Sequence, residues 1–401
     1  MGAAIFRTMP WLGPTRAGAY LVLLAVVQVG LLAFLIASSA NGIDRNGFLL
    51  GTDFISFWTS GRMLQAGQNV YDGAAHIATQ RAYFATQDGY TAFFYPPGYL
   101  FACWPLGLLG YFPALVGWLL ITGGAYLAAV RAWLRAYPVE MPLWLLFAGF
   151  PPVLITITHG QSSFLVAALI GGGLLLARRN PLAAGVLLGL ATIKPQLGVL
   201  VPIALLASRE WRTITFAGLT TLALAALAAL AFETDVWALW LEASGRAQGA
   251  LVGGDVGYAK MVSPFAAAML LGAPSGVAWA VQAGATLAVA GALAWLALGR
   301  GWGLGVAAAT LAGSTLATPF VLDYDLVLLA FPLVWLTAEG LRSGWRDWEK
   351  LAVAVAFAAP LIARPLAIST GVPIIPLAVG LLFAVVVRRA ARPTIDPTPD
   401  T

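Results

Sequence analysis

Charged side chains are scarce in this sequence of 401 residues. Only 10% of the residues are charged and 60% are hydrophobic, whereas soluble globular domains are on average about a quarter charged. This composition excludes a soluble globular protein. Apolar runs as long as one membrane crossing needs, about 20 residues, recur along the chain, for example at 17–40 and 274–298. We therefore expect a single integral membrane domain over residues 1–392 and not a soluble domain with an anchor.

Cysteine and histidine are nearly absent as well. The single cysteine, Cys103, excludes an intramolecular disulfide, and its apolar surroundings favour a small core residue. The two histidines, His76 and His159, lie far apart, so no Cys/His cluster resembles a zinc site. No metal site and no cofactor are expected on this basis.

Nucleotide-binding motifs are missing too. The chain has no phosphate-binding loop of the form G-x-x-x-x-G-K-S/T and no G-x-G-x-x-G between a strand and a helix. Its formal net charge of +5 would suit a nucleic-acid-binding protein, but basic residues in membrane proteins collect on cytoplasmic loops for reasons of insertion. We expect membrane lipids as partners and no nucleic acid.

The apolar runs predict an all-α polytopic membrane protein with about 12 membrane helices, within a range of about 10 to 13. The first run follows basic residues, as in a signal peptide, but it exceeds the roughly 7–15 residues of a signal-peptide core and is interpreted as an uncleaved span. The expected helices lie near 17–40, 113–131, 141–158, 163–177, 182–193, 196–208, 213–232, 275–298, 303–319, 326–341, 350–363 and 372–388.

The positions of Lys and Arg orient these helices. With both termini in the cytoplasm, most of the 22 basic residues fall on the cytoplasmic side. Two polar loops then face outward, a large first loop at 41–97 and a second loop at 233–273. The tail at 393–401 is polar and proline-rich, and it is predicted to be a disordered cytoplasmic segment.

Two segments do not fit a simple crossing. Segment 96–110 is apolar but short, and a full span there would place basic residues outside, so a re-entrant or interfacial helix is expected. Segment 181–207 lies between two basic groups that are both assigned to the cytoplasm. It must enter the membrane and return, with the reversal near Lys194-Pro195, because proline cannot continue a regular helix.

Polar residues at membrane depth or just outside a span are the informative ones, because a charge in lipid is costly. Asp53 follows the first span, where a carboxylate can accept a proton from a hydroxyl at the membrane surface; a helix N-cap is the alternative. His159 and Gln161 end an apolar run and can hold a phosphate or a sugar hydroxyl. The alternative is a histidine that merely ends its helix.

Three further positions are candidates for binding. Lys194 stands at the proposed reversal and needs a counter-charge, which a lipid phosphate or the carboxylate of Asp325 can supply. Asp323 and Asp325 flank Tyr324 at the start of an apolar run, where they can bind sugar hydroxyls or a cation, or simply begin a helix. A divalent cation therefore stays open. Tyr95 begins a rigid Tyr-Pro-Pro turn near the loop of Asp53.

The ordered set of these motifs resembles glycosyltransferase family 87. That family groups bacterial membrane proteins of the GT-C superfamily, including mannosyltransferases that depend on polyprenyl-phosphate-mannose. The motifs that carry the resemblance are DFISFWTSGRMLQAGQNVYD (53–72), FFYPPGYLFACWPLGLL (93–109), HGQSSFLVAALIGGGLLLARRNPLAAGVLLGLATIKPQ (159–196) and ATPFVLDYDLVLLAFPL (317–333).

The resemblance implies a GT-C fold with its active site outside the bacterial cytoplasmic membrane. Asp53 matches the catalytic aspartate of the first outer loop and would act as the base in an inverting transfer. The donor would be a hexose, mannose favoured, on a polyprenyl phosphate, and the acceptor a glycolipid or envelope glycan. The remaining roles are binding of the donor phosphate by Lys194, His159, Gln161 and Arg62, and binding of sugar or acceptor by Tyr95, Asp323, Tyr324 and Asp325.

One departure and two rival functions remain. No histidine is found at 317–325, where Asp323-Tyr324-Asp325 stands instead, so the acceptor is left open. A transporter or flippase of a lipid-linked sugar would also use a broken helix with a lysine at membrane depth. A non-catalytic subunit of an envelope assembly would tolerate the loss of Asp53.

Overall fold

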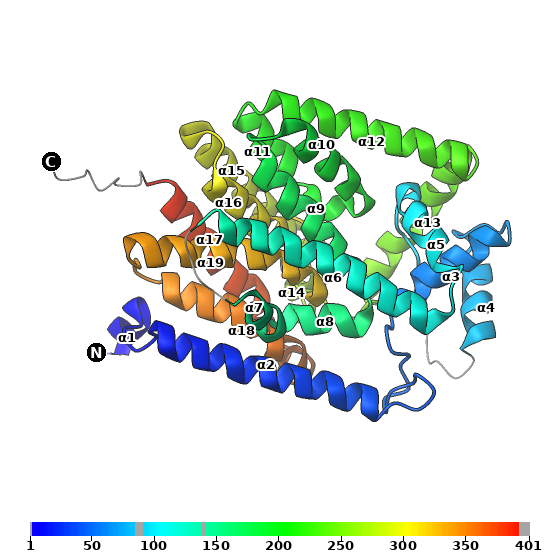
Figure 1. Ribbon diagram of the computed structural model, residues 1–401, viewed down its shortest axis with the longest axis horizontal. Helices are drawn as coiled ribbons and strands as arrows, with labels where there is room; N and C mark the ends of the chain where they lie inside the picture. The colour runs from blue at the N-terminus through cyan, green and yellow to red at the C-terminus, as the bar shows by residue number, and fades with distance from the viewer. Residues whose placement is uncertain (1, 85–90, 138–141, 393–401) are drawn as a thin grey trace.

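The computed structural model describes residues 2–84, 91–137 and 142–392 (Figure 1). The described residues form helices joined by short connections, with three isolated β-bridges and no strand. The protein is an all-α polytopic membrane protein, as the composition predicted. The expected disordered tail at 393–401 lies outside the described residues.

Six helices in the described part of the chain are long and apolar enough to cross a membrane. Each has 21 residues or more, and at about 1.5 Å per residue such a helix reaches about 30 Å, the thickness of the hydrocarbon core. They are α2 (Pro14–Ala37), α6 (Tyr111–Arg135), α12 (Trp211–Ala231), α15 (Ser275–Arg300), η4 with α17 (Asp323–Ser343) and α18 (Glu349–Thr370).

Other expected spans are represented by shorter helices, so the count of about 12 crossings stays a prediction. The run at 141–158 is divided between α7 (Leu143–Gly149) and α8 (Pro151–His159), because Pro151 and Pro152 cannot donate the hydrogen bonds that would continue α7. The remaining short apolar helices are α9 (Ser163–Leu176), α10 (Pro181–Leu190), α11 (Val201–Ala207), α16 (Leu304–Ser314) and α19 (Ile375–Ala390).

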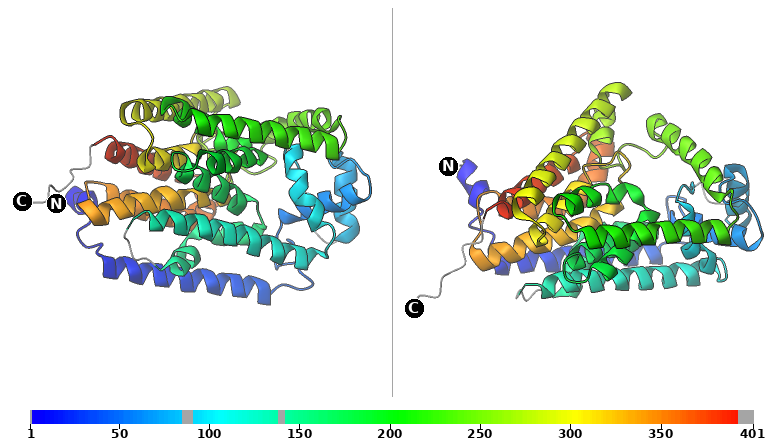
Figure 2. Two further views of the ribbon diagram at one scale, coloured as in Figure 1. Left: turned by 45° about the horizontal axis from the view of Figure 1, so that its top comes forward. Right: turned by 90° about the horizontal axis from the view of Figure 1, so that it is seen from above.

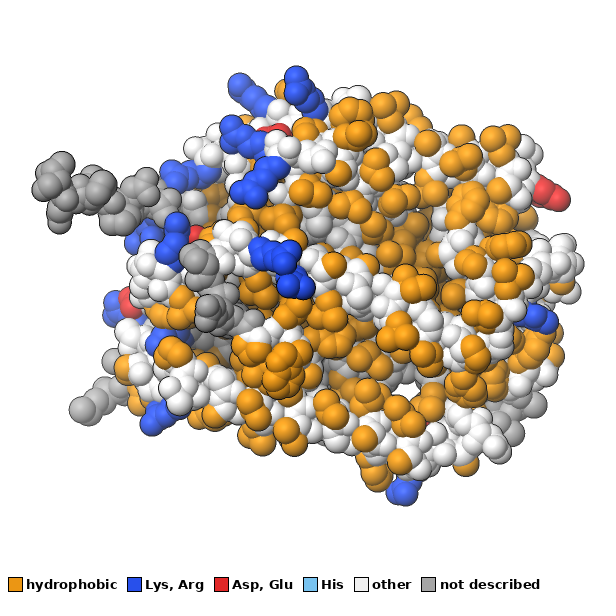
Figure 3. All heavy atoms as spheres, viewed as in Figure 1, with side chains coloured by type: hydrophobic (Ala, Val, Ile, Leu, Met, Phe, Trp, Pro, Cys, Tyr) orange, Lys and Arg blue, Asp and Glu red, His pale blue; other side chains and the backbone are white. Residues whose placement is uncertain are grey.

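Most of the long helices follow the longest axis of the molecule, as the further views confirm (Figure 2). The described part of the chain begins and ends at the same end of the molecule, where α1 (Gly2–Thr8) packs on α18 and Arg7 pairs with Asp347. At the opposite end lie α3 (Phe54–Gln65), α4 (Gly73–Tyr83) and α5 (Leu100–Leu106). On the face seen in Figure 3, most Lys and Arg side chains gather toward the end that holds the termini, and apolar side chains are spread over the middle.

The chain breaks at Lys194-Pro195, where two short 3-10 helices, η2 (Ala191–Ile193) and η3 (Pro195–Gly198), replace a continuous helix. Gly185 of α10 faces Phe216 of α12, and Gly189 faces Thr220 one turn further on, so α10 and α12 run parallel. Since α11 ends only a few residues before α12 begins, α11 must run back toward the start of α10. The chain therefore reverses between α10 and α11, near Lys194-Pro195, and its place in the membrane stays a prediction.

Segment 96–110 does not cross the membrane as one helix. It forms η1 (Pro97–Tyr99) and the seven-residue α5, which reaches only about 10 Å. A Cβ on Gly61 of α3 would lie 2.2 Å from the backbone oxygen of Cys103 in α5. This contact without an intervening side chain fixes α3 on α5, and Cys103 is fully buried as a core residue.

Both expected outer loops contain helices. The first contains α3 and α4, and the second contains α13 (Val236–Gly253) and α14 (Pro264–Leu270). A β-bridge between Met261 and Leu322 joins the second loop to the segment before η4 (Asp323–Leu329). These connections bring residues from widely separated parts of the chain to one place.

Candidate functional site

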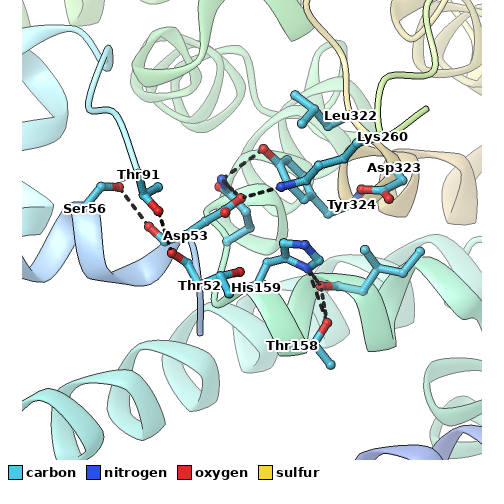
Figure 4. A network of polar contacts seen from close by, with 12 residues as sticks. Thr52, Asp53, Ser56, Thr91, Thr158, His159, Lys260, Leu322, Asp323 and Tyr324 are labelled. Atoms are coloured by element: carbon cyan, nitrogen blue, oxygen red, sulfur yellow. Dashed lines mark hydrogen bonds and ion pairs between the residues drawn. The ribbon is translucent and has the colours of Figure 1, made fainter. Parts of the chain in front are cut away.

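Asp53 lies at the centre of a polar cluster built from four separate segments (Figure 4). It occupies the N-cap position of α3, but its side chain accepts no capping hydrogen bond. The carboxylate instead accepts a hydrogen bond from Gln161 Nε2 at 3.0 Å and faces Lys260 Nζ at 3.6 Å. The helix-cap interpretation of Asp53 is therefore wrong for its side chain, and the carboxylate is directed into the cluster.

The backbone holds Asp53 in this position. Its amide donates to the carbonyl of His159 at 3.0 Å, and the amide of Gly51 donates to Thr158 at 3.1 Å, so the first outer loop is bound to the end of α8. Gly160 then ends α8 with φ +62°, and a Cβ at this position would lie 2.6 Å from Cβ of Phe54. Only glycine permits both this conformation and this close approach.

Gln161 uses its whole amide inside the cluster. Nε2 donates to Asp53 and to the hydroxyl of Tyr324 at 3.1 Å, while Oε1 accepts from the hydroxyl of Tyr95 at 2.9 Å and from the amide of Ser162 at 2.8 Å. These four contacts fix which end of the amide carries nitrogen. In the structure Gln161 contacts the Asp53 carboxylate directly, while its expected role in phosphate binding stays a prediction.

Electrostatics keep the Asp53 carboxylate ionised although it is only 8% exposed. Burial by itself raises the pKa of this group, but Lys260, His159 and the hydrogen bond from Gln161 together outweigh burial, and the pKa of Asp53 lies below its usual value. Asp53 is therefore an oriented, deprotonated carboxylate at neutral pH. That is the state a proton acceptor requires.

Lys260 belongs to this cluster and was missed in the sequence. Its carbonyl accepts a hydrogen bond from the amide of Asp323 at 3.2 Å, and its Nζ lies 5.5 Å from the ring centre of Tyr324. The available signal was that Lys260 is one of three lysines in the chain and precedes an apolar segment. No local pattern tied it to Asp53, because their contact depends on the β-bridge of the second outer loop.

His159 lies beside the carboxylate and the tyrosine. Its Nδ1 is 2.8 Å from the carbonyl oxygen of Ile155, and its ring centre is 5.7 Å from that of Tyr324. Because a carbonyl only accepts, Nδ1 carries a proton. Figure 4 shows His159 next to Asp53 and Lys260.

The carboxylate of Asp325 lies against Lys194 as its counter-charge. Nζ lies 2.5 Å from Oδ1, which also accepts from the hydroxyl of Ser163 at 2.6 Å. Oδ2 of the same carboxylate accepts from the amide of Leu322 at 3.2 Å. Both charged side chains are almost completely buried. We call this buried Lys194–Asp325 ion pair the closed pair, and Tyr324 packs beside it with its ring centre 5.0 Å from Lys194 Nζ. The contact favours the alternative in which Asp325 supplies the counter-charge of Lys194.

Asp323 points to a different cation. Its Oδ2 lies 3.8 Å from Nη1 of Arg364 in α18, and the Arg364 side chain is 42% exposed. Arg364 was also missed, because the expected span at 350–363 ended just before it. An arginine within an apolar helix is nevertheless a signal of function. The two aspartates considered for a divalent cation thus face two different basic residues, and the described residues contain no group of three or more potential metal ligands.

Arg62 is the one predicted site residue that lies outside the cluster. Nine residues separate it from Asp53 on α3, which corresponds to about 13 Å and half a turn at about 100° per residue. Its Nε donates to the hydroxyl of Tyr83 at 3.1 Å and its Nη1 to the carbonyl of Gly107 at 3.0 Å. It lines a separate cavity of about 390 Å³ between α3 and α4. The expected contact of Arg62 with a phosphate beside Asp53 is not supported by this position.

The comparisons with known proteins agree with this part of the chain. The model of glycosyltransferase family 87 matches residues 93–332, a range that includes Tyr95, His159, Gln161, Lys194 and Lys260 together with the segment 323–325. No curated protein and no solved structure matches the chain.

Proposed function

The chain belongs to glycosyltransferase family 87 and is a membrane glycosyltransferase. From this premise we propose that it uses a lipid-linked donor at the extracytoplasmic face of its membrane. The donor is a hexose, mannose favoured, on a polyprenyl phosphate. The acceptor is a hydroxyl of a glycolipid or envelope glycan. The protein would lie in the bacterial cytoplasmic membrane with both termini in the cytoplasm and a fold of the GT-C type.

The observation that carries this proposal is the buried Asp53 carboxylate, held by Gln161 and surrounded by basic groups. Asp53 takes the proton of the acceptor hydroxyl as the oxygen attacks the anomeric carbon. The bond between that carbon and the phosphate oxygen breaks on the opposite face, and its electron pair leaves with the lipid phosphate. Displacement from the opposite face inverts the configuration at the anomeric carbon.

The leaving phosphate gains negative charge, so the site needs accessible cations. Lys194 does not supply an accessible charge, because its side chain is 5% exposed and is matched by Asp325. Lys260 and Arg364 are more accessible, with side chains 17% and 42% exposed, and their ion pairs are longer, at 3.6 and 3.8 Å. We assign the donor phosphate to the space that these two residues face, and the hydroxyls of the sugars to Tyr324 and His159.

The distribution of charge supports an outward-facing site. Basic side chains gather at the end of the molecule that holds the termini, as expected for a cytoplasmic side. Asp53 follows α2, which begins near that end, and is placed at the far end of this helix. Nucleotide sugars are cytoplasmic substrates, so a site on the far side favours a lipid-linked donor.

The test is transfer by the purified protein in membrane extract. Labelled polyprenyl-phosphate-mannose, polyprenyl-phosphate-glucose and the corresponding nucleotide sugars are supplied separately. We expect transfer from one lipid-linked donor and none from the nucleotide sugars. Label that crosses the membrane of proteoliposomes without a new glycosidic bond would support the flippase instead.

A further inference from the structure

We propose that Lys260 is an exchangeable counter-ion, which holds Asp53 in the empty enzyme and moves to the donor phosphate when the lipid binds, so that Asp53 is released to accept the acceptor's proton. This inference rests on the proposed function and specifies how its two halves, donor binding and base catalysis, are coupled. It assigns to Lys260 direct contact with the donor.

The two lysine–aspartate pairs of the site differ in the way this role requires. Lys194 and Asp325 are 2.5 Å apart, and their side chains are 5% and 0% exposed. Lys260 and Asp53 are 3.6 Å apart, with side chains 17% and 12% exposed. A buried pair is held by the cost of leaving either charge without its partner, whereas a longer and partly hydrated pair exchanges more readily. Only the second pair is suited to opening for a ligand.

The backbone at Lys260 is fixed while its side chain is free to move. The amide of Val262 donates to Val321 at 3.0 Å, and the amide of Asp323 donates to Lys260 at 3.2 Å. These bonds tie the base of the side chain to η4. The ammonium lies at the end of a flexible four-carbon stem, and Asp53 is the one side-chain ion-pair partner it has among the described residues. Movement of the ammonium therefore requires no rearrangement of the fold.

The neighbouring charges favour exchange by a phosphate. Three elements contribute the groups around Lys260 and Asp53: α8 contributes His159, η4 contributes Asp323 and Tyr324, and α18 contributes Arg364. The closed Lys194–Asp325 pair lies against Tyr324. The positive charge of Lys260 is also the largest of the influences that oppose burial and lower the pKa of Asp53. When the ammonium moves to a phosphate, the carboxylate loses this stabilisation and becomes a stronger base.

The proposed step balances in protons and charge. The proton of the acceptor hydroxyl goes to Asp53, and the electron pair of the broken bond goes to the lipid phosphate. The ammonium keeps its three protons throughout and only changes partner. It stays beside the phosphate as that group changes from a singly charged phosphodiester to a phosphomonoester of higher negative charge.

The direct test is a double-mutant cycle on lipid-phosphate binding, with radiolabelled decaprenyl phosphate and protein in nanodiscs. If Asp53 competes with the phosphate for Lys260, Asp53→Asn should bind decaprenyl phosphate about three- to tenfold more tightly than wild type. Lys260→Gln should bind it more weakly. The Asp53→Asn/Lys260→Gln double variant should bind like Lys260→Gln, because the benefit of removing Asp53 needs the freed lysine.

Three controls complete this test. Lys350→Gln removes a lysine at the other end of the molecule, which binds the carbonyls of Met9 and Leu12, and should leave binding unchanged. Inorganic phosphate at the same concentration should not displace the lipid, and full displacement would overturn a lipid-phosphate site. Lys260→Arg keeps a mobile cation and should restore most of the binding that Lys260→Gln loses.

The pH dependence of turnover provides a second readout. Removing Lys260 should shift the acid limb of kcat/KM to higher pH, because the cation that lowers the pKa of Asp53 is absent. An unchanged limb, or equal weakening of binding by Asp53→Asn and Lys260→Gln, would make Lys260 a fixed structural partner. Those outcomes would leave sugar transfer by the wild type intact, so failure of the exchange is distinct from failure of the proposed function.

Discussion

Gln161 illustrates how single residues give this site its geometry. Its amide reaches Asp53, Tyr95 and Tyr324 at once, and each contact constrains the others because the two ends of an amide are not interchangeable. A carboxylate held in this way does not need to reorient before it accepts a proton, and such preorganisation is a main source of rate enhancement.

Removal of this amide should therefore slow the chemical step. Gln161→Ala is expected to lower kcat about 10- to 100-fold with a small change in the KM for donor, since a poorly placed base costs roughly this much. Steady-state kinetics with the productive donor measure both constants. Gln65→Ala is the matched control, because Gln65 donates to the carbonyl of Trp104 away from the cluster. Equal loss in both variants would contradict the positioning role.

Lys194 should matter more for stability than for chemistry. Lys194→Met leaves the fully buried Asp325 without its ion-pair partner, which typically costs about 3–5 kcal/mol. Unfolding in detergent should detect this loss. The double variant Lys194→Met/Asp325→Leu should recover much of it, because no uncompensated charge remains. Glu242→Gln disrupts the exposed pair with Arg246 and should change little. A stable Lys194→Met protein that has lost donor binding would instead restore the phosphate role.

At the scale of elements, the sequence predicted where the chain breaks and which motifs meet, but not every residue that completes the site. Pro195 allowed the reversal after Lys194 to be predicted, because the constraint is local. The structure brings Asp53, Gln161 and Tyr324, which the polar motifs had assigned to one site, into contact, and their roles stay predictions. Lys260 and Arg364 were missed because they reach the cluster only through contacts between distant elements, which no local spacing encodes. Arg62 was misplaced because half a turn of α3 was not taken into account.

The first outer loop contains a buried network that supports α3. His76 Nδ1 lies 3.0 Å from Gln80 Nε2, and the Gln80 amide is oriented by both backbone groups of Thr91. Nδ1 therefore accepts, and the ring proton on Nε2 faces Ser60 at 3.2 Å. The hydroxyl of Thr91 donates to Thr52, next to Asp53. A neutral His76 fits this network, and a protonated ring would place a donor against the Gln80 nitrogen.

Stability should consequently fall in mild acid. Burial lowers the pKa of His76 from 6.5 to about 4, so between these values the unfolded chain binds more protons than the folded one. The contribution of neutral His76 to the free energy of unfolding is complete above pH 6.5 and is lost as the pH falls toward 4. Its total is of the order of 3 kcal/mol. Thermal unfolding in detergent from pH 7.5 to 4.5 measures it. His76→Gln should remove most of this pH dependence, and an identical slope in both proteins would contradict the assignment.

At the scale of the whole molecule, most basic side chains gather at one end, and the outer-loop helices α3, α4 and α5 lie at the other. The end that holds the termini also holds Arg7, Asp347 and Lys350, which join α1 to α18. Asp53 follows α2 along the chain, and α3, which begins directly after Asp53, lies with α4 and α5 at the opposite end. Under the proposed function, this polarity would give the enzyme access to its lipid-linked donor from one side of the membrane.

Cysteine labelling tests this orientation. In a Cys103→Ala background the protein has no other cysteine, so single cysteines report their own location. Asp255→Cys, in the second outer loop, should react with a membrane-impermeant maleimide in intact cells. Arg179→Cys, between α9 and α10, should react only after permeabilisation. The opposite pattern would invert the topology and move the site to the cytoplasm.

The central claim is that Asp53 is the base of a lipid-linked sugar transferase. The most direct measurement is single-turnover transfer of labelled sugar from the productive polyprenyl-phosphate donor by wild type, Asp53→Asn and Asp44→Asn. Asp44 is the control, because its carboxylate accepts only the local amides of Asn46 and Phe48 in the same loop. The account predicts that Asp53→Asn folds normally and transfers about 10²- to 10⁴-fold more slowly, while Asp44→Asn stays near wild type. A folded Asp53→Asn enzyme that transfers sugar at the wild-type rate would contradict it.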